Sequence, residues 1–255
     1  MARLKAVKHE ERLTLVEHLD ELRTRLIVSL AVLGVALGLC FWQNHLLLDI
    51  ANGPLPDEHD RLLTFGVAEP FTTTLMVSAY SALLLALPVL LYQLYAFVLP
   101  AFSDSERRVI TPMLLVVPLL FIAGVVFAYF VVMPAATKFL LNFNDDQFNV
   151  QVRARDYYGF FVTTLLAVGL IFQMPVGILA VTRLGIVTPD QLAANRRYAL
   201  LVIAILAAAL PGVDPVTMLI EMVPLVVLYE LSIVLARLFG RSSEGPLPEP
   251  STQER

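Results

Sequence analysis

Apolar residues occupy most of this chain in long runs, and short polar stretches separate one run from the next. A helix needs about 20 residues to cross the hydrocarbon core of a membrane, and most of the runs reach or exceed that length. The pattern predicts six transmembrane helices, over residues 26–42, 71–102, 109–137, 157–182, 198–213 and 216–236. The fifth run is the shortest. A Pro-Gly-Val-Asp-Pro stretch at 211–215 predicts a tight turn that makes a hairpin of the last two helices.

The segment 14–25 places dense charge directly before the first apolar run. Its leucines recur at helical spacing, while Glu17, Glu21 and Arg25 fall four residues apart on another face. Thr14 with Glu17 forms the pattern of a capping box, which predicts that the helix begins there. The charged face could simply be solvated and held by ion pairs between successive turns.

Composition agrees with a membrane protein. Hydrophobic residues make up 58% of the chain, charged residues 16%, and the mean hydropathy is +0.74. The net charge of −4 comes without a basic stripe, so no nucleic-acid partner is expected. A lone cysteine, Cys40, excludes a disulfide or a thiolate metal site within one chain, and we expect it to pack. The run 26–42 has no signal-peptidase pattern after it and is expected to remain as the first span.

No residue pattern of an enzyme is visible. The chain has no phosphate-binding glycine loop and no HExxH motif, and all four histidines lie outside the predicted spans. His18 is interpreted as a solvated helix residue. We therefore predict no catalytic residue, no metal and no cofactor.

Lys and Arg residues predict the orientation. Fourteen lie in the N-terminal segment, in the loops near 103–108 and 183–197, or after the last span, whereas four lie in the opposite loops. By the positive-inside rule the fourteen are cytoplasmic, so both termini face the cytoplasm and an even number of spans is required. The outer loops are then 43–70, 140–156 and the 211–215 turn. Asn52-Gly53-Pro54 in the first of them is turn chemistry.

Five prolines lie within or near the ends of the apolar helices. They are Pro88, Pro118, Pro134, Pro175 and Pro224. Each removes a backbone hydrogen bond and bends its helix, although membrane helices tolerate proline more readily than soluble ones. Their spread over several spans predicts a curved assembly.

Three polar residues stand out within the predicted spans: Gln173, Glu221 and Glu230. A carboxylate in lipid is costly, so such groups usually face protein or water and mark a functional surface. Glu230 lies near the cytoplasmic end and could instead reach the headgroups or pair with Arg237. These three are our candidates for intramembrane polar or partner contacts.

Several motifs together resemble TatC, the polytopic subunit of the twin-arginine protein translocase. The matching stretches are His18–Arg23, Pro88–Phe97 with Leu99–Pro100, Glu106–Arg108, Phe127–Val132 with Pro134, and Tyr229–Glu230. The resemblance implies an all-α integral membrane protein with six transmembrane helices and both termini cytoplasmic. It also implies a concave, glove-like bundle with proline-bent helices and short fifth and sixth spans.

The function that this resemblance implies is that of the translocase receptor. It binds twin-arginine signal peptides of folded proteins and assembles with TatA-type and TatB-type single-span subunits. Export across the cytoplasmic membrane of a prokaryote is then driven by the proton gradient. Self-association within the receptor complex is expected as well.

The site residues that the resemblance implies are Glu21 and Glu106 for the paired arginines, with Arg23 and Phe97 nearby. Two carboxylates that are fixed and not already neutralised would suit two guanidinium groups. Glu106 could also merely pair with its basic neighbours. Pro54 and Asp214 are implied as functional positions on the outer side.

This sequence departs from the family pattern at two positions. Gln173 stands where many members have glutamate, and Met218 stands where a glutamine is common. The first departure argues against a titratable role for position 173. The second weakens the expectation of a polar partner-binding patch on the sixth span and leaves Glu221 as a substitute only by proximity.

The predicted organisation has three parts: an amphipathic cytoplasmic segment at 1–25, the membrane domain at 26–237 and a disordered cytoplasmic tail at 238–255. A secondary transporter for a small solute is a rival hypothesis, but the inverted repeat expected of one is not visible. A scaffold without a ligand of its own is a third hypothesis.

Overall fold

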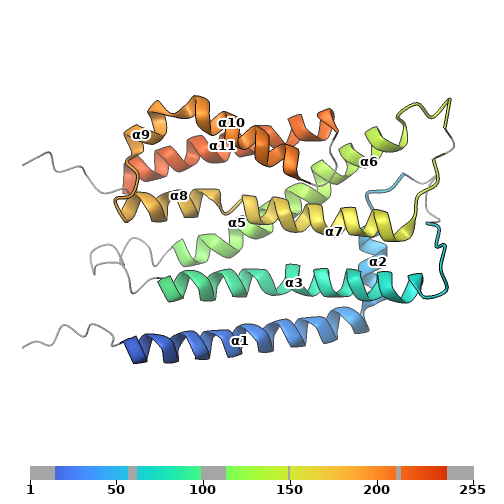
Figure 1. The fold of residues 1–255 in the computed structure, drawn as a ribbon, viewed down its shortest axis with the longest axis horizontal. Coiled ribbons are helices and arrows are strands. Elements are labelled where there is room, and N and C mark those ends of the chain that lie inside the picture. Colours follow the sequence, from blue (N-terminus) through green and yellow to red (C-terminus); the bar gives the residue numbers. More distant parts are fainter. Residues whose placement is uncertain (1–14, 57–61, 99–112, 149, 211–213, 240–255) are drawn as a thin grey trace, which may run out of the picture.

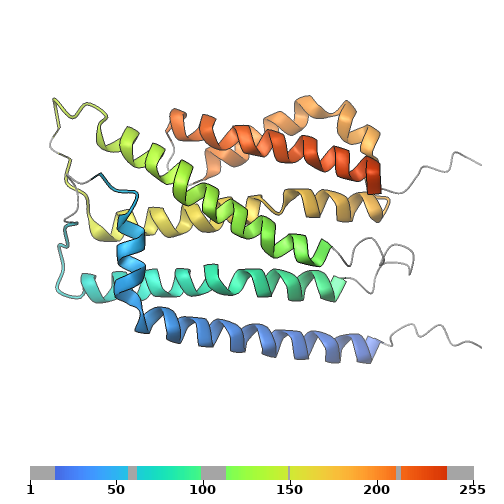
Figure 2. The same cartoon turned by 180° about the vertical axis from the view of Figure 1, so that it is seen from behind.

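The protein is a bundle of helices, shown from two sides in Figures 1 and 2. The computed structural model describes residues 15–56, 62–98, 113–148, 150–210 and 214–239. Across those ranges the regular structure is helical apart from one isolated bridge, Leu63 with Arg153. The predicted all-α class is therefore confirmed.

The helices have the following bounds in chain order: α1 Leu15–Trp42, α2 Asn44–Asn52, α3 Glu69–Val98, α5 Met113–Phe127, η3 Ala128–Val132, α6 Met133–Leu141, α7 Ala154–Ile171, α8 Met174–Arg183, α9 Pro189–Ala194, α10 Arg196–Ala209 and α11 Pro215–Phe239.

The charged segment and the first apolar run form one continuous helix, α1. The helix does not break near residue 25. The predicted boundary there is therefore a change in hydropathy within a single helix and not the end of a structural element. Thr14 of the expected capping box lies outside the described residues. Small side chains let α1 pack closely on α3, where Ala36 and Cys40 meet Ala82 and Ala86. Cys40 is buried in this contact, as expected.

Prolines divide two of the predicted spans. The third consists of α5, a π-helical turn η3 and α6, with Pro134 in the first turn of α6. The fourth is broken at Phe172 and Gln173, just before Pro175 in the first turn of α8. A proline cannot donate to the preceding turn, so the backbone widens or breaks ahead of it. Pro88 and Pro224, in contrast, lie inside unbroken helices.

Five segments are long and apolar enough to cross a membrane: His18–Trp42, Glu69–Val98, Leu115–Leu141, Ala154–Arg183 and Pro215–Leu238. α10, with 14 residues, would span only about 21 Å and is not among them. Whether it makes the sixth crossing stays a prediction. The expected short sixth helix is wrong, because α11 has 25 residues and continues beyond the apolar run to Phe239.

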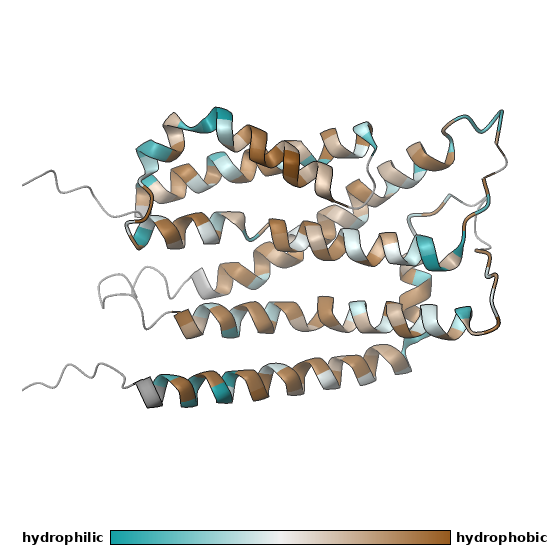
Figure 3. Ribbon diagram, viewed as in Figure 1, coloured by the Kyte–Doolittle hydropathy of each residue, from teal (hydrophilic) through white to brown (hydrophobic). Residues whose placement is uncertain are grey.

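The start of α1, the end of α3, the start of α5, α9 and the end of α11 lie at one end of the bundle, whereas α2 and the loop after α6 lie at the other (Figure 1). α11 begins short of the level that α6 and the start of α7 reach. Figure 3 shows hydrophobic residues along most helices, with hydrophilic ones in the first turns of α1 and in α9. The start of α1 and the end of α11 at the same end of the bundle fit an even number of crossings.

α2 was not predicted. It crosses beside α1 and α3 within the stretch expected to be an outer loop (Figure 2). Its end does match the expected turn, because the helix stops at Asn52 and Gly53–Pro54 follow as a turn.

The main apolar core lies around α7. Tyr157, Phe161 and Leu165 on that helix are buried, and the cluster extends to Ala51 of α2 and Met133 of α6. This core fixes the long helices relative to one another, and the polar sites lie where these helices meet.

Candidate functional site

A polar site lies where the first third of α1 meets the last turns of α3. Arg25 donates from Nε and Nη2 to Glu21 Oε1, at 2.9 and 2.5 Å. Its Nη1 donates to Gln93 Oε1 at 2.9 Å, and Nη2 lies 3.4 Å from the carbonyl oxygen of Ala96. Because Arg25 contacts both helices, the Glu21 carboxylate is held in a fixed position relative to α3.

An aromatic contact closes one side of this site. The rings of His18 and Phe97 stack with centroids 4.3 Å apart and planes 14° apart. His18 Nδ1 is also 3.8 Å from Glu21 Oε2. His18 is therefore not the merely solvated residue that we expected, since the closeness of α1 to α3 supplies it with a partner. Arg23 is exposed on α1.

The arrangement corrects one expectation about Glu21. We expected a carboxylate not already neutralised, whereas Glu21 shares Oε1 with Arg25 one turn along the same helix. The other carboxylate oxygen of Glu21, Oε2, lies toward His18 and is the oxygen that Arg25 does not contact. Glu106, the other expected carboxylate, lies outside the described residues. A cavity of about 430 Å³ adjoins the pair, and its lining residues are Asp20, Glu21, Thr24, Arg25, Val28 and Gln93.

Gln93 is a site residue that the sequence analysis missed. It was an amide in an otherwise apolar run, the same signal that singled out Gln173. A buried or half-buried amide in a membrane helix usually has a polar partner, and here that partner is Arg25.

Gln173 lies at the break between α7 and α8 and is buried, with 8% of its surface exposed. Its Nε2 donates to the backbone carbonyl of Val117 at 3.2 Å, which ties the break to α5. The amide therefore supports the helix break, and its Oε1 has no partner in the part of the chain described.

Glu230 makes a bidentate ion pair with Arg196 at the start of α10. Arg196 donates from Nε at 2.7 Å and from Nη2 at 2.9 Å. The expected alternative of a pair with Arg237 is wrong, because the chain folds back through α10 and brings Arg196 to Glu230. Arg237 lies 3.6 Å from Asp190 instead. The Glu230 carboxylate raises the pKa of Arg196. This pair closes the α10–α11 hairpin at one end.

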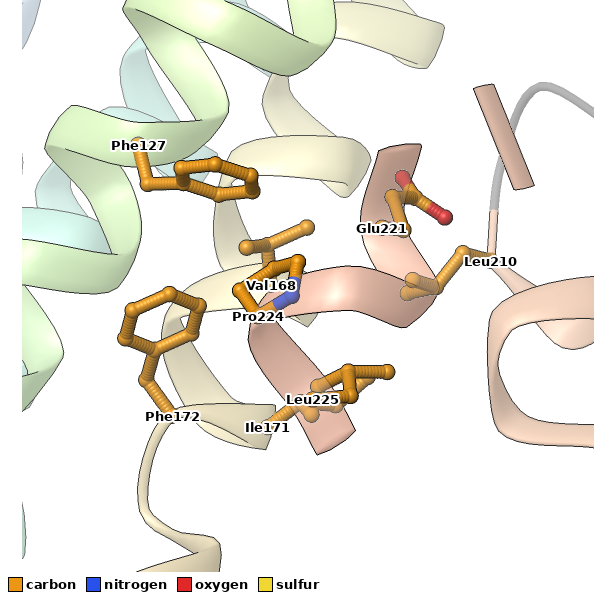
Figure 4. A pocket seen from close by; sticks show the side chains of 8 residues that line it. All are labelled: Phe127, Val168, Ile171, Phe172, Leu210, Glu221, Pro224 and Leu225. Atoms are coloured by element: carbon orange, nitrogen blue, oxygen red, sulfur yellow. The ribbon is translucent and has the colours of Figure 1, made fainter. Parts of the chain in front are cut away.

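Glu221 is the most enclosed of the polar candidates, with 3% of its surface exposed. Figure 4 shows it beside a small apolar space between α11, α7, α5 and the end of α10. Its Oε1 has no hydrogen-bond partner among the described residues. The other two intramembrane candidates have partners: Glu230 pairs with Arg196, and the Gln173 amide donates to a backbone carbonyl. Among the described residues, Glu221 has neither kind of partner.

The two expected outer-side positions are structural contacts. The Pro54 carbonyl accepts a hydrogen bond from Thr137 Oγ1 at 3.0 Å, which ties the end of α2 to α6. Asp214 Oδ1 accepts from the backbone N–H of Thr217 at 2.8 Å, which caps the start of α11. Both groups fix where a helix begins or ends.

An ion pair between the start of α3 and the residue before α7 was also missed. Arg153 Nε donates to Glu69 Oε1 at 2.6 Å, and Glu69 Oε2 accepts from the backbone N–H groups of Phe65 and Gly66. The Glu69 carboxylate raises the pKa of Arg153. Neither residue carried a sequence signal, because 84 positions separate them and both lie at the edges of apolar runs.

Comparison with known proteins settles the family. Residues 17–224 match the family model described as Sec-independent protein translocase protein (TatC). The chain belongs to the TatC family. A TatC protein of Carboxydothermus hydrogenoformans is 37% identical over 231 residues, which cover 89% of this chain and 94% of that relative.

The likeness extends to plants and to solved structures. A chloroplastic TATC protein of Arabidopsis thaliana is 37% identical over 234 residues, or 91% of this chain and 68% of that relative. A crystal structure of the twin arginine translocase receptor TatC is 33% identical and superposes with a TM-score of 0.73. It covers 88% of this chain and 99% of its own. The resemblance inferred from the motifs is therefore confirmed, and with it a membrane transport role in place of an enzymatic one.

Proposed function

We propose that this chain is the signal-peptide receptor of a twin-arginine translocase in the cytoplasmic membrane of a prokaryote. The observation that carries the proposal is the carboxylate of Glu21, held against α3 by Arg25 beside a cavity of about 430 Å³. A related protein of known structure is named a twin arginine translocase receptor, which supports the proposal.

Glu21 and Glu106 take the two guanidinium groups of the peptide in this proposal. An arginine–carboxylate contact is bidentate and stronger than its lysine counterpart, so the pair favours Arg-Arg over Lys-Lys. Phe97 and His18 offer a flat apolar surface beside Glu21, on which an arginine side chain can lie. Arg23, exposed on the same helix, contributes to the rim of the site.

The peptide must compete with Arg25 for Glu21. A guanidinium that arrives from the cavity meets Oε2 first, because Arg25 occupies Oε1. If it then displaces Arg25, the Gln93 side chain and the Ala96 carbonyl remain as acceptors for the displaced group. Because the displaced Arg25 guanidinium keeps hydrogen-bond acceptors, the free-energy cost of the exchange is small.

The partners that we propose follow from the family. Single-span TatA-type and TatB-type subunits assemble on the apolar outer surface of the helices, and further copies of the chain join the receptor complex. The proton gradient drives export of the folded cargo. Both termini are cytoplasmic in this arrangement, and Pro54 and Asp214 act on the outer side by fixing the ends of α2 and α11.

Peptide binding to the full-length protein in lipid nanodiscs tests the receptor role. Glu21→Gln and Glu106→Gln should each weaken binding of a labelled Arg-Arg signal peptide by about 1.5–3 kcal/mol, the contribution of a charged hydrogen bond. Each should also narrow the preference over a Lys-Lys peptide. Asp190→Asn is the matched control, because this exposed acid lies at the same end of the bundle. Full affinity and full selectivity in the Glu21, Glu106 double variant would refute the site.

A further inference from the structure

Glu221 lies in the second turn of α11 with an apolar surround. Phe127 at the end of α5, Val168 and Ile171 of α7, and Leu210 after α10 line the space beside it (Figure 4). The volume of that space is about 10 Å³, roughly the room that one water molecule needs. An ionised carboxylate in such surroundings would have to be paired to be tolerated.

The described residues supply no such pairing. The titratable side chains on the elements packed against α11 are Tyr129 of η3, Lys138 of α6, Arg155, Asp156, Tyr157 and Tyr158 of α7, Arg183 of α8, Asp190 of α9, and Arg196, Arg197 and Tyr198 of α10. Throughout the described ranges, none of them forms an ion pair with Glu221. On α11 itself the other titratable groups are Tyr229, Glu230 and Arg237; the last two are paired with Arg196 and Asp190. Asp214, just before α11, has the same sign of charge as Glu221. The neutral carboxylic acid is therefore the form that this site stabilises.

Two further buried oxygens lead from Glu221 toward the start of α11. Asp214, Thr217 and Glu221 are spaced by three and four residues and so share one face of the helix. Their exposed fractions are 4%, 0% and 3%. Asp214 Oδ2, Thr217 Oγ1 and Glu221 Oε1 each lack a hydrogen-bond partner in the part of the chain that is described. Side chains of a helix lean toward its N-terminus, so Glu221 leans toward Thr217.

We propose that Glu221 is a buried proton-binding site and that Asp214 and Thr217 form the route by which its proton exchanges with water at the start of α11. In the binding step a hydronium ion at the start of α11 gives up a proton, which passes along the Asp214 and Thr217 oxygens of this face. An O–H bond forms on the Glu221 carboxylate, and one water molecule is released.

Infrared difference spectroscopy on the full-length protein in lipid vesicles tests this site. At neutral pH the protein should show a carboxylic-acid C=O band that Glu221→Gln abolishes. Glu230→Gln is the matched control on the same helix, and it should leave the band intact because that carboxylate is half exposed and paired with Arg196. The absence of a band specific to Glu221 at neutral pH would overturn the proposal.

Deuterium exchange of the same band tests the route. Thr217→Val removes the buried hydroxyl at nearly constant volume and should slow the shift of the band after transfer to heavy water. Thr163→Val is the control, because that hydroxyl donates to the Gly159 carbonyl within its own helix. Unchanged exchange in Thr217→Val would overturn the assigned route. Neither measurement depends on signal-peptide binding, so the outcome is independent of the receptor role.

Discussion

Arg153, just before α7, and Glu69, the first residue of α3, are 84 residues apart in the sequence and form an ion pair, with Arg153 Nε 2.6 Å from Glu69 Oε1. Leu63 reinforces the contact, because its N–H donates to the Val152 carbonyl and its own carbonyl accepts from the N–H of Ala154. Arg153 also lies over the ring of Phe65, 5.6 Å from its centroid. The start of α3 and the start of α7 are thereby fixed to each other.

We expect Glu69→Gln to loosen this junction. The neutral amide cannot accept from Arg153, Phe65 and Gly66 as the carboxylate does, so the loops should become more accessible to protease and the apparent melting temperature in detergent should fall. Asp145→Asn, in the exposed loop after α6, is the control. Equal protease resistance in both variants would show that the ion pair is dispensable.

Close packing of α5 on α7 depends on two glycines. A Cβ on Gly124 would lie 2.8 Å from Phe172 Cγ and 3.0 Å from the Cα of Gly169. Gly124→Ala should therefore destabilise the protein by about 1–3 kcal/mol, the usual cost of overpacking. Gly34→Ala, which meets nothing within 4 Å, should be neutral or slightly stabilising. Thermal unfolding in detergent measures both, and equal stability of the two variants would contradict the assigned contact.

Arg25→Gln should strengthen binding of an Arg-Arg peptide by about two- to fivefold. The substitution frees Glu21 Oε1, and a partly exposed ion pair is worth about 0.5–1 kcal/mol. Arg197→Gln, an exposed arginine on α10, should leave the affinity unchanged. Weaker binding in Arg25→Gln would contradict this prediction and would mean that the position Arg25 gives Glu21 contributes more to affinity than the release of Oε1.

Orientation can be read from single thiols in a Cys40→Ala background. A cysteine at Ala194 should react only from the cytoplasm and one at Gln147 only from outside, if the positive-inside rule holds. A cysteine at Ser242 tests the count of crossings, because six spans place it on the same side as Ala194. If the cysteines at positions 242 and 194 were labelled from opposite sides, α10 would not cross the membrane.

The sequence by itself determined the class of the protein. Long apolar runs require helices in lipid, because no water is available there to satisfy the backbone, and the described helices follow those runs closely. The expectation that prolines disturb the helices holds at Pro134 and Pro175, where the third and fourth runs widen or break, since a missing N–H acts locally. Pro88, Pro118 and Pro224 lie inside unbroken helices. Motifs near His18, Pro88 and Phe127 were enough to identify the family.

Only the tertiary structure decided the partners of the polar side chains. Glu21 with Arg25 could be expected from helical spacing, whereas the contacts of Arg25 to Gln93 and of His18 to Phe97 depend on how α1 lies against α3. Glu230 meets Arg196 because α9 and α10 return the chain to α11. A partner brought close by packing leaves no periodic pattern in the sequence. The ion pairs, and the lack of a partner for Glu221 among the described residues, therefore follow only from the placement of the helices.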